Sequence, residues 1–177
     1  MNISPIPKLN TERLFLRKIE ISDLDTLFFL RTDKIVNQYI ERPESRRIKN
    51  KADAEVFILK TLKEMENNKS ITWAICLKED AQMIGSICLW NYSEDLQKAE
   101  VGYDLNPQFH NKGIMGEALK MVIQFGTESL NFKTIEAYTD TNNMGSKRLL
   151  EKNGFQLNSD RKDEGNSRNV IYAFKTN

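Results

Sequence analysis

Apolar residues recur along the chain with two different periods, which predict alternating strands and helices. Three apolar stretches read as consecutive strands: Ile71 to Leu77, Met83 to Trp90 and Ala99 to Leu105. Short polar turns join them, which favours antiparallel pairing. The segment from Ala52 to Glu66 has helical spacing instead, because its apolar residues fall on one face. Those residues are Ala54, Phe57, Ile58, Leu62 and Met65.

The residues before this helix predict a strand, a shorter helix and a loop. Leu9 to Arg17 reads as the opening strand, and Ser22 to Leu30 as a helix. A capping box of Ser22 and Asp25 would open that helix. The segment from Ile40 to Lys51 is rich in arginine and lysine and lacks apolar periodicity. We expect a solvated loop there, with a position beside a substrate or a phosphate group as the alternative.

The second half of the chain predicts strands that alternate with helices. An amphipathic helix follows Gly113, the strand Thr134 to Thr139 comes next, and a second helix opens near Asn143. Phe155 to Arg161 and Asn169 to Lys175 then form a final strand pair around a polar turn. Because strand, helix and strand in succession require parallel neighbours, the sheet is mixed. We therefore expect an α/β fold with residues 1–177 in a single domain.

Composition narrows the class of partner. The chain has 26 Lys and Arg against 25 Asp and Glu, and a net charge of +1 gives no support to a nucleic-acid or membrane partner. Cys76 and Cys88 lie inside expected strands without metal-binding or disulfide spacing, so we expect reduced core residues of a cytoplasmic protein. The segment Met1 to Pro5 lacks the pattern of a signal peptide, and no apolar run has the length of a membrane span.

The segment from His110 to Leu119 carries the most specific chemistry. It places Gly113 and Gly116 where a strand ends and an amphipathic helix begins. The first amides of a helix lack internal partners and lie at the positive end of its dipole, and glycine lets an anion approach them closely. The sequence therefore predicts a phosphate-binding helix start, for which a plain helix start is the alternative.

A second motif follows, in which Asn142 to Phe155 reads as an asparagine-capped helix closed by glycine and phenylalanine. Together the two motifs resemble the GNAT family of acyl-CoA-dependent N-acetyltransferases. The phosphate loop of that family has the pattern Gln/Arg-x-x-Gly-x-Gly/Ala, and its next helix begins Asn-x-x-Ser/Ala. The opening segment Leu9 to Arg17 is similar to that of RimJ/RimL-type enzymes. The resemblance extends from about Leu9 to Phe174 and implies a mixed, mostly antiparallel, splayed sheet flanked by helices.

The resemblance implies acetyl-CoA as the co-substrate and no metal. The pantetheine arm of the coenzyme would pair with the backbone of Leu105 and Asn106, at an edge that the splay leaves open. The pyrophosphate would lie against the helix start, at Lys112, Gly113, Ile114, Met115, Gly116 and Glu117. Met115 departs from the family pattern, which backbone donors tolerate if its side chain points into the core. His110 departs as well, and we expect it to pack or to line the coenzyme rather than to catalyse.

Asn143 and Ser146 complete the implied coenzyme site. Asparagine is a favoured helix N-cap, and the family uses the same side-chain amide near the pantetheine arm. We expect Asn143 to serve both purposes, with a cap alone as the alternative. Ser146 comes one turn later and would face the same way.

Acetyl transfer to an amine requires a neutral amine and donors for the tetrahedral oxyanion. By the resemblance, Glu100 lies on the strand that carries the acetyl group, so we expect it to act as general base. A carboxylate that only pairs across strands is the alternative. The family's tyrosine that protonates the leaving thiolate corresponds to Leu150, which cannot donate a proton. Tyr103, Tyr138 and unassisted departure of the thiolate stay open.

The expected activity is therefore acetyl transfer from acetyl-CoA to a primary amine, in first place the α-amine of a protein N-terminus of the ribosomal-protein type. A small amine is the second interpretation, and an acidic acceptor pocket would favour its polyamine or aminoglycoside version over an amino acid. A module that binds acyl-CoA without turnover is the third. Exposed edges of the last strand pair would allow a homodimer.

Overall fold

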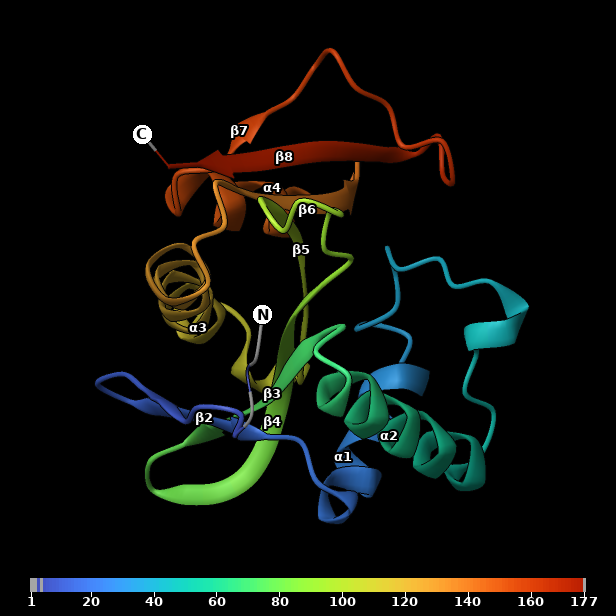
Figure 1. Ribbon diagram of the computed structural model, residues 1–177. Coiled ribbons are helices and arrows are strands. Elements are labelled where there is room, and N and C mark those ends of the chain that lie inside the picture. Colours follow the sequence, from blue (N-terminus) through green and yellow to red (C-terminus); the bar gives the residue numbers. More distant parts are fainter. Residues whose placement is uncertain (1–2, 4, 177) are drawn as a thin grey trace.

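The computed structural model describes residue 3 and residues 5–176, and its strands form one mixed sheet of eight (Figure 1). The strands are β1 Leu9–Asn10, β2 Leu14–Lys18, β3 Ile71–Leu77, β4 Asp80–Trp90, β5 Lys98–Leu105, β6 Thr134–Asp140, β7 Gln156–Leu157 and β8 Asn169–Lys175. Their order across the sheet is β1-β2-β3-β4-β5-β6-β8-β7. Only β5 and β6 are parallel neighbours, so the expected mixed, mostly antiparallel sheet is confirmed.

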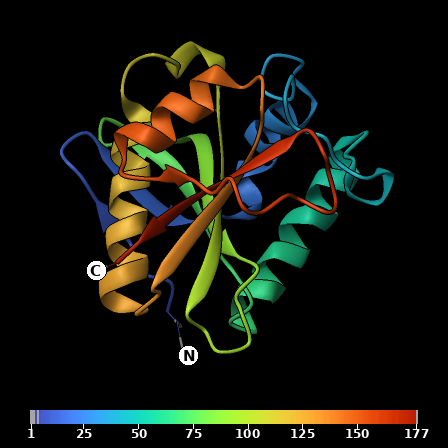
Figure 2. The ribbon, with the colours of Figure 1, turned by 90° about the horizontal axis from the view of Figure 1, so that it is seen from above.

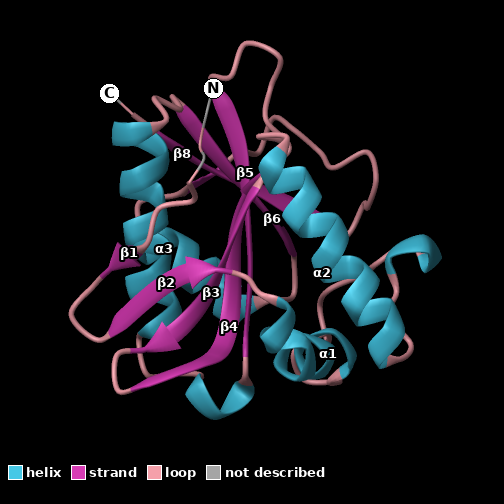
Figure 3. Ribbon diagram, turned by 60° about the horizontal axis from the view of Figure 1, so that its bottom comes forward, coloured by secondary structure: helices cyan, strands magenta, loops and turns pink. Residues whose placement is uncertain are grey.

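The α-helices cover both faces of this sheet. They are α1 Leu24–Thr32, α2 Lys51–Glu66, α3 Ile114–Gln124 and α4 Met144–Lys152. Figure 2 shows α3 and α4 on one side of the sheet and α1 and α2 on the other, and Figure 3 shows the strands between them. No helix in the described residues is long and apolar enough to cross a membrane.

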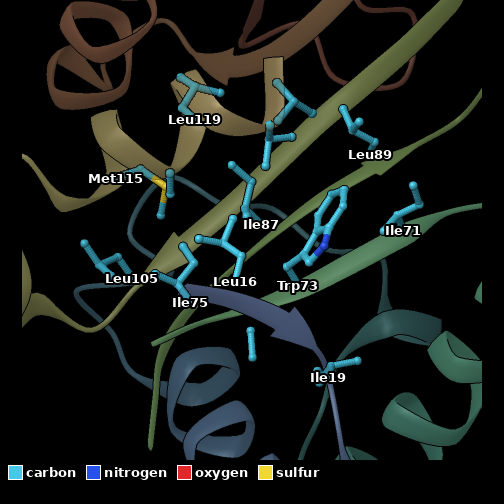
Figure 4. Packing of buried hydrophobic residues seen from close by; sticks show 14 of the residues in the cluster. Leu16, Ile19, Ile71, Trp73, Ile75, Ile87, Leu89, Leu105, Met115 and Leu119 are labelled. Atoms are coloured by element: carbon cyan, nitrogen blue, oxygen red, sulfur yellow. The ribbon is translucent and has the colours of Figure 1, made fainter. Parts of the chain in front are cut away.

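The core lies where the apolar faces of the strands meet the helices. Trp73 and Ile75 of β3 are fully buried, and Figure 4 shows them beside Ile87 of β4. Burying one such side chain contributes about 1.5–3 kcal/mol. The indole nitrogen of Trp73 donates a hydrogen bond to the carbonyl of Pro7 at 2.9 Å, so its one polar atom is satisfied.

The opening segment forms two strands, where the sequence predicted one from Leu9 to Arg17. The amide of Thr11 donates to the carbonyl of Leu14 at 3.0 Å, which closes a turn. β1 then pairs back on β2 with Leu9 opposite Leu16. The turn brings Thr11 and Arg13 next to the start of α3, where both bond Glu117.

The capping box expected from Ser22 and Asp25 was wrong. Glu20 and Asp23 form the box instead, around a 3-10 turn that precedes α1. Asp23 is buried and accepts an ion-pair hydrogen bond from Arg17 at 2.6 Å. The ion pair with Arg17 compensates the cost of burying the Asp23 carboxylate. Asp25 is exposed, so its carboxylate has no such cost.

The last strand pair is shorter than the expected Phe155 to Arg161. β7 spans Gln156–Leu157 only, and Arg161 lies in the loop beyond it, where its side chain bonds the carboxylate of Glu136 on β6. β8 lies between β6 and β7, so the strand that follows α4 is not a neighbour of β6. The parallel pairing predicted for the second half is confirmed for β5 and β6 alone.

α2 confirms the predicted helix, with Asn50 as its N-cap and Asp53 as the third residue of a capping box. The basic segment before it contains the short 3-10 turn Glu44–Arg46 and is otherwise a loop. It is not solvated throughout, because Arg42 is half-buried and lines a cavity.

Candidate active site

The sheet opens between β5 and β6. Parallel pairing joins Lys98, Ala99 and Glu100 to Thr134, Ile135 and Glu136 and stops there. β5 nevertheless continues to Leu105, paired with β4 on its other side. Within the described residues no strand pairs with the open side of β5 beyond Glu100. A ligand that carries amides can add to such an edge.

The start of α3 has the geometry of an anion-binding helix N-terminus. Gly113 is the N-cap residue, and its φ of 75° lies in the left-handed region that glycine adopts without strain. The amide of Glu117 makes the first helical bond, to the carbonyl of Gly113 at 3.1 Å. The preceding amides, from Ile114 to Gly116, point out of the helix end without a helical partner. Met115 is buried, and Figure 4 shows its side chain among core residues.

Arg13 and Glu117 hold this helix start, a relationship that the sequence analysis missed. Arg13 donates to Glu117 Oε2 from Nε at 2.7 Å and to the carbonyl of Lys112 at 3.0 Å. Glu117 also accepts from the hydroxyl of Thr11. Burial alone would raise the pKa of Glu117, but the hydrogen bonds from Thr11 and Arg13 outweigh it and lower that pKa. Glu117 therefore helps to fix the start of α3 through its side chain. Its amide is already bonded within the helix.

The end of β5 is tied to the loop that precedes α3. His110 donates from Nε2 to the carbonyl of Leu105 at 3.0 Å. The amide of Asn106 donates to the carbonyl of Ile84 at 2.9 Å, and its side-chain oxygen accepts from the amide of Gln108. Leu105 ends β5, and Asn106 after it is fixed by its own bonds, so the expected contact of these two residues with the coenzyme stays a prediction. His110 stabilises the loop, in line with the packing role expected for it.

α4 brings two expected residues to the other side of the opening. The side-chain oxygen of Asn143 accepts from the amide of Ser146 at 3.0 Å, so the predicted N-cap is present. The hydroxyl of Ser146 lies 2.8 Å from the hydroxyl of Tyr103 on β5. Burial raises the pKa of Tyr103 to about 12 despite the hydrogen bond with Ser146, so its phenol stays protonated at neutral pH.

The two faces of β5 point to different layers of the protein, because alternate side chains of a strand share a face. Tyr103 reaches Ser146 on α4, so its face is that of α3 and α4. Asp104 reaches Arg31 on α1 at 3.8 Å, so Glu100 and Asp104 face α1 and α2. Molecules bound on the two faces would meet at the opening of the sheet.

Glu100 differs from the other carboxylates on the α1 and α2 face of the opened strands. Those others are Asp104, Glu136 and Asp140, and each has an arginine or lysine nitrogen within 3.8 Å. Among the described residues Glu100 has no ion-pair partner within 4.0 Å and accepts one hydrogen bond, from Asn91 at 3.2 Å. Burial raises its pKa to about 7, more than the hydrogen bond from Asn91 lowers it. Such a carboxylate can exchange a proton near neutral pH.

The remaining hydroxyl candidates fall in different places. Leu150 is fully buried in the core, so nothing replaces the family's tyrosine at that position. Tyr138 donates to Glu136 at 3.3 Å and accepts from Arg161 at 3.2 Å, which places it on the α1 and α2 face. Tyr103 alone of the two expected tyrosines faces α3 and α4.

Comparisons with known proteins agree with this geometry. A family model described as "Acetyltransferase (GNAT) domain" matches residues 13–156. The chain is 32% identical over 148 residues to "Uncharacterized N-acetyltransferase p20" of Bacillus licheniformis. The matched region covers 84% of this chain and 82% of that protein.

Two solved structures show how widely the fold is shared. RimL, a ribosomal L7/L12 alpha-N-protein acetyltransferase in complex with coenzyme A, has a TM-score of 0.81 at 16% identity, over 96% of this chain and 98% of that one. The microcin C7 self immunity acetyltransferase MccE, in complex with acetyl-CoA and AMP, has a TM-score of 0.79 at 20% identity, over 94% of each chain. At these identities the likeness concerns the fold.

Proposed function

The chain belongs to the GNAT acetyltransferase family, and from that premise we propose that it moves acetyl from acetyl-CoA to the α-amine of a protein N-terminus in the cytoplasm. The observation that carries the proposal is the open edge of β5 beside the glycine-opened start of α3. Two proteins of the same fold support it, since RimL is described with coenzyme A and MccE with acetyl-CoA.

In this proposal the coenzyme binds from the α3 and α4 side. Its pyrophosphate lies against the amides from Lys112 to Gly116, where the helix dipole favours negative charge. Its pantetheine arm follows the open edge of β5 between Glu100 and Leu105, and Asn143 and Ser146 border it on α4. Arg13 and Glu117 do not touch the phosphates in this account but fix the helix start that does.

The reaction needs one proton acceptor and one leaving-group contact. The acceptor nitrogen attacks the thioester carbonyl, and Glu100 takes the proton that the nitrogen loses. The C–S bond then breaks, the amide forms, and the thiolate leaves as coenzyme A. Backbone amides on the open edge near Leu105 would stabilise the oxyanion.

Tyr103 is the proposed contact for the departing sulfur. Its hydroxyl, held by Ser146, faces the side on which the coenzyme would lie. Its pKa of about 12 exceeds the ordinary thiol pKa of about 8.5, so a hydrogen bond to the thiolate is favoured over complete proton transfer. The proton carried by Glu100 then returns to the thiolate through solvent.

The pKa of Glu100 favours an α-amine over a lysine side chain as acceptor. A protein α-amine has a reference pKa of about 7.7 to 8.0, against about 10.4 for lysine. A base with a pKa of about 7 is close to the first value and far from the second. RimL, a protein of the same fold, is described as an alpha-N-protein acetyltransferase.

Thiol release from acetyl-CoA, measured against a panel of amines, tests the proposal. The panel contains a peptide with a free N-terminal serine, the same peptide with a blocked N-terminus and an internal lysine, and spermidine. We expect release with the free peptide only, and mass spectrometry should place the acetyl group on its α-amine. Coenzyme binding without release for every amine would contradict acetyl transfer, and spermidine as the preferred acceptor would contradict the substrate class.

A further inference from the structure

A cavity of about 600 Å³ lies on the α1 and α2 face, lined by residues from the end of α1, from the loop between α1 and α2, and by Arg168 before β8. Arg31 on its wall reaches Asp104 of β5 at 3.8 Å. Arg168, on the opposite wall, reaches Asp140 of β6 at 2.7 Å. Two arginines of the cavity lining therefore reach the two strands that have separated, one strand each. Figure 2 shows α1, which contributes to this lining, on the side of the sheet opposite α3, so the cavity is distinct from the proposed pyrophosphate site.

The lining of this cavity is strongly cationic. Its charged residues are Arg31, Arg42, Arg47, Lys49, Arg168 and a single acid, Glu41. Most of the cations have a carboxylate partner. Glu44 pairs with Arg47 at 3.0 Å and with Lys49 at 2.5 Å, while Arg31 and Arg168 pair with the strand residues already named. The sequence predicts a solvated loop here, with a position beside a substrate or a phosphate group as the alternative, but it does not predict the cavity itself.

Arg42 is the exception. Within the described residues it has no carboxylate oxygen within 4.0 Å, and its one side-chain hydrogen bond goes to the amide oxygen of Asn37. Asn37 is itself fixed, because its Nδ2 donates to the carbonyls of Leu30 and Asp33 at 2.9 and 2.7 Å. The guanidinium of Arg42 is therefore half-buried and hydrogen-bonded to a fixed amide, without an ion-pair partner within 4.0 Å among the described residues.

The surroundings disfavour the charge on Arg42 as they stand. Burial, followed by the nearby positive charge of Arg31, lowers the pKa of Arg42 to about 10, and the carboxylate of Asp104 offsets this only in part. A buried cation without a counterion is costly, and such groups concentrate at binding sites. An anion bound in the cavity would relieve both effects, and a guanidinium suits a carboxylate because it can donate two parallel hydrogen bonds.

The position of the cavity relative to Glu100 sets the size of the acceptor. Asp104 and Glu100 share a face of β5 and are four residues apart, which corresponds to about 13 Å along a strand. An extended peptide spans the same distance in about four residues. An amine near Glu100 and an anion near Arg42 can therefore belong to one short N-terminal segment.

We propose that the acceptor is a protein N-terminus with an aspartate or glutamate within its first four residues, and that Arg42 binds this carboxylate. The inference rests on the proposed acetyl transfer and adds to it the chemistry of the acceptor. It also excludes polyamines and aminoglycosides as preferred substrates, because their positive charges would face Arg31, Arg42 and Arg168.

Acetylation kinetics with synthetic peptides test the inference. Three peptides begin with serine and carry aspartate, asparagine or lysine at the next two positions, and acetyl-CoA is kept saturating at low ionic strength. We expect kcat/KM for the aspartate peptide to exceed that for the asparagine peptide about 10-fold, with the lysine peptide lowest. Arg42→Gln should abolish this preference through KM without changing the KM of acetyl-CoA. Arg42→Lys should retain part of it.

Lys34→Gln is the matched control, because it removes one positive charge from the same loop without touching the cavity lining. It should keep the preference for the acidic peptide. Free aspartate, added as an acceptor, is too short to place its amine near Glu100 and its carboxylate near Arg42 together, so turnover of free aspartate that depends on Arg42 would contradict the proposed spacing. Equal kcat/KM for acidic and neutral peptides in the wild type, or an undiminished preference in Arg42→Gln, would overturn the inference and leave acetyl transfer intact.

If no amine is acetylated, the proposed function fails while Arg42 can still be tested. Calorimetry then measures the binding of the aspartate and asparagine peptides to the protein saturated with coenzyme A. Tighter binding of the aspartate peptide that is lost in Arg42→Gln would support the carboxylate site. Equal or absent binding would overturn it.

Discussion

The hydroxyl groups of Tyr103 and Ser146 lie 2.8 Å apart and join β5 to the first turn of α4 across the opening of the sheet. In the proposed mechanism this pair borders the thioester of the coenzyme. Ser146 follows Asn143, whose cap fixes the first turn of α4 and with it the direction of the serine. The Tyr103 phenol is thus positioned by a helix start rather than by its own strand alone.

Removal of the Tyr103 hydroxyl should slow the departure of coenzyme A. A hydrogen bond to a charged group contributes about 1.5–3 kcal/mol, so Tyr103→Phe should lower kcat about 10-fold or more with little change in the KM of the acceptor. Tyr138→Phe is the control, because that hydroxyl bonds to Glu136 and Arg161 on the other face. Steady-state kinetics of both variants decide the matter, and equal effects would remove Tyr103 from the mechanism.

Coenzyme affinity should depend on Gly113 far more than on Gly116. A side chain at Gly113 would force a residue with a Cβ into a φ of 75°, about 1–2 kcal/mol of strain, and would approach the guanidinium of Arg13 at 3.4 Å. We expect Gly113→Val to bind coenzyme A at least 10-fold more weakly by calorimetry while remaining folded. Gly116→Ala has ordinary contact distances of 3.6 Å or more and should bind normally. Unchanged affinity in Gly113→Val would refute the phosphate placement.

Asn143→Ala should reduce both stability and coenzyme affinity, because its side chain caps α4 and borders the proposed pantetheine path. Loss of a cap costs about 1 kcal/mol. Asn50→Ala removes an equivalent cap from α2, far from the coenzyme, and should lower only the melting temperature. The check is thermal unfolding together with the KM of acetyl-CoA. Were the two variants to behave alike, Asn143 would be a cap and nothing more.

Glu100 should make the protein less stable as pH rises. Its pKa is about 7 in the folded protein and 4.5 ordinarily, so between these values the folded state holds a proton that the unfolded chain has released. The free energy of unfolding of the wild type therefore falls as pH rises through this range. At a pH above the range, Glu100→Gln should be more stable than the wild type by about 1–3 kcal/mol. Glu136→Gln should be less stable there, because it loses ion pairs. Denaturant unfolding at about pH 4 and about pH 8 measures both differences.

The sequence predicted the elements that depend on local pattern. The helix start at Gly113 and the cap at Asn143 follow from residue types that few other local structures require, and both are present. The paired strands β3, β4 and β5 follow from apolar runs and short turns in the same way. Their bounds were close because propensity, patterning and turn chemistry agree in these segments.

The features that sequence could not predict depend on contacts between distant residues. The bond between Arg13 and Glu117 joins residues 104 positions apart, and it ties the turn between β1 and β2 to the start of α3. The capping box contains Asp23 and not the expected Ser22 and Asp25, because Arg17 can pair with the Asp23 carboxylate. The sequence shows a run of basic residues but not which of them form ion pairs. That Arg42 lacks such a partner among the described residues is therefore clear only from the structure.

The pH dependence of acetyl transfer in Glu100→Gln tests the account most directly. In the wild type, kcat/KM for a peptide acceptor should rise as Glu100 loses its proton through a pH of about 7. In Glu100→Gln we expect turnover to fall about 100-fold while coenzyme affinity is unchanged. The acidic limb of its pH–rate profile should shift to the pKa of the acceptor amine, about 8. A variant with near wild-type turnover across that limb would contradict the assignment of Glu100 as the base.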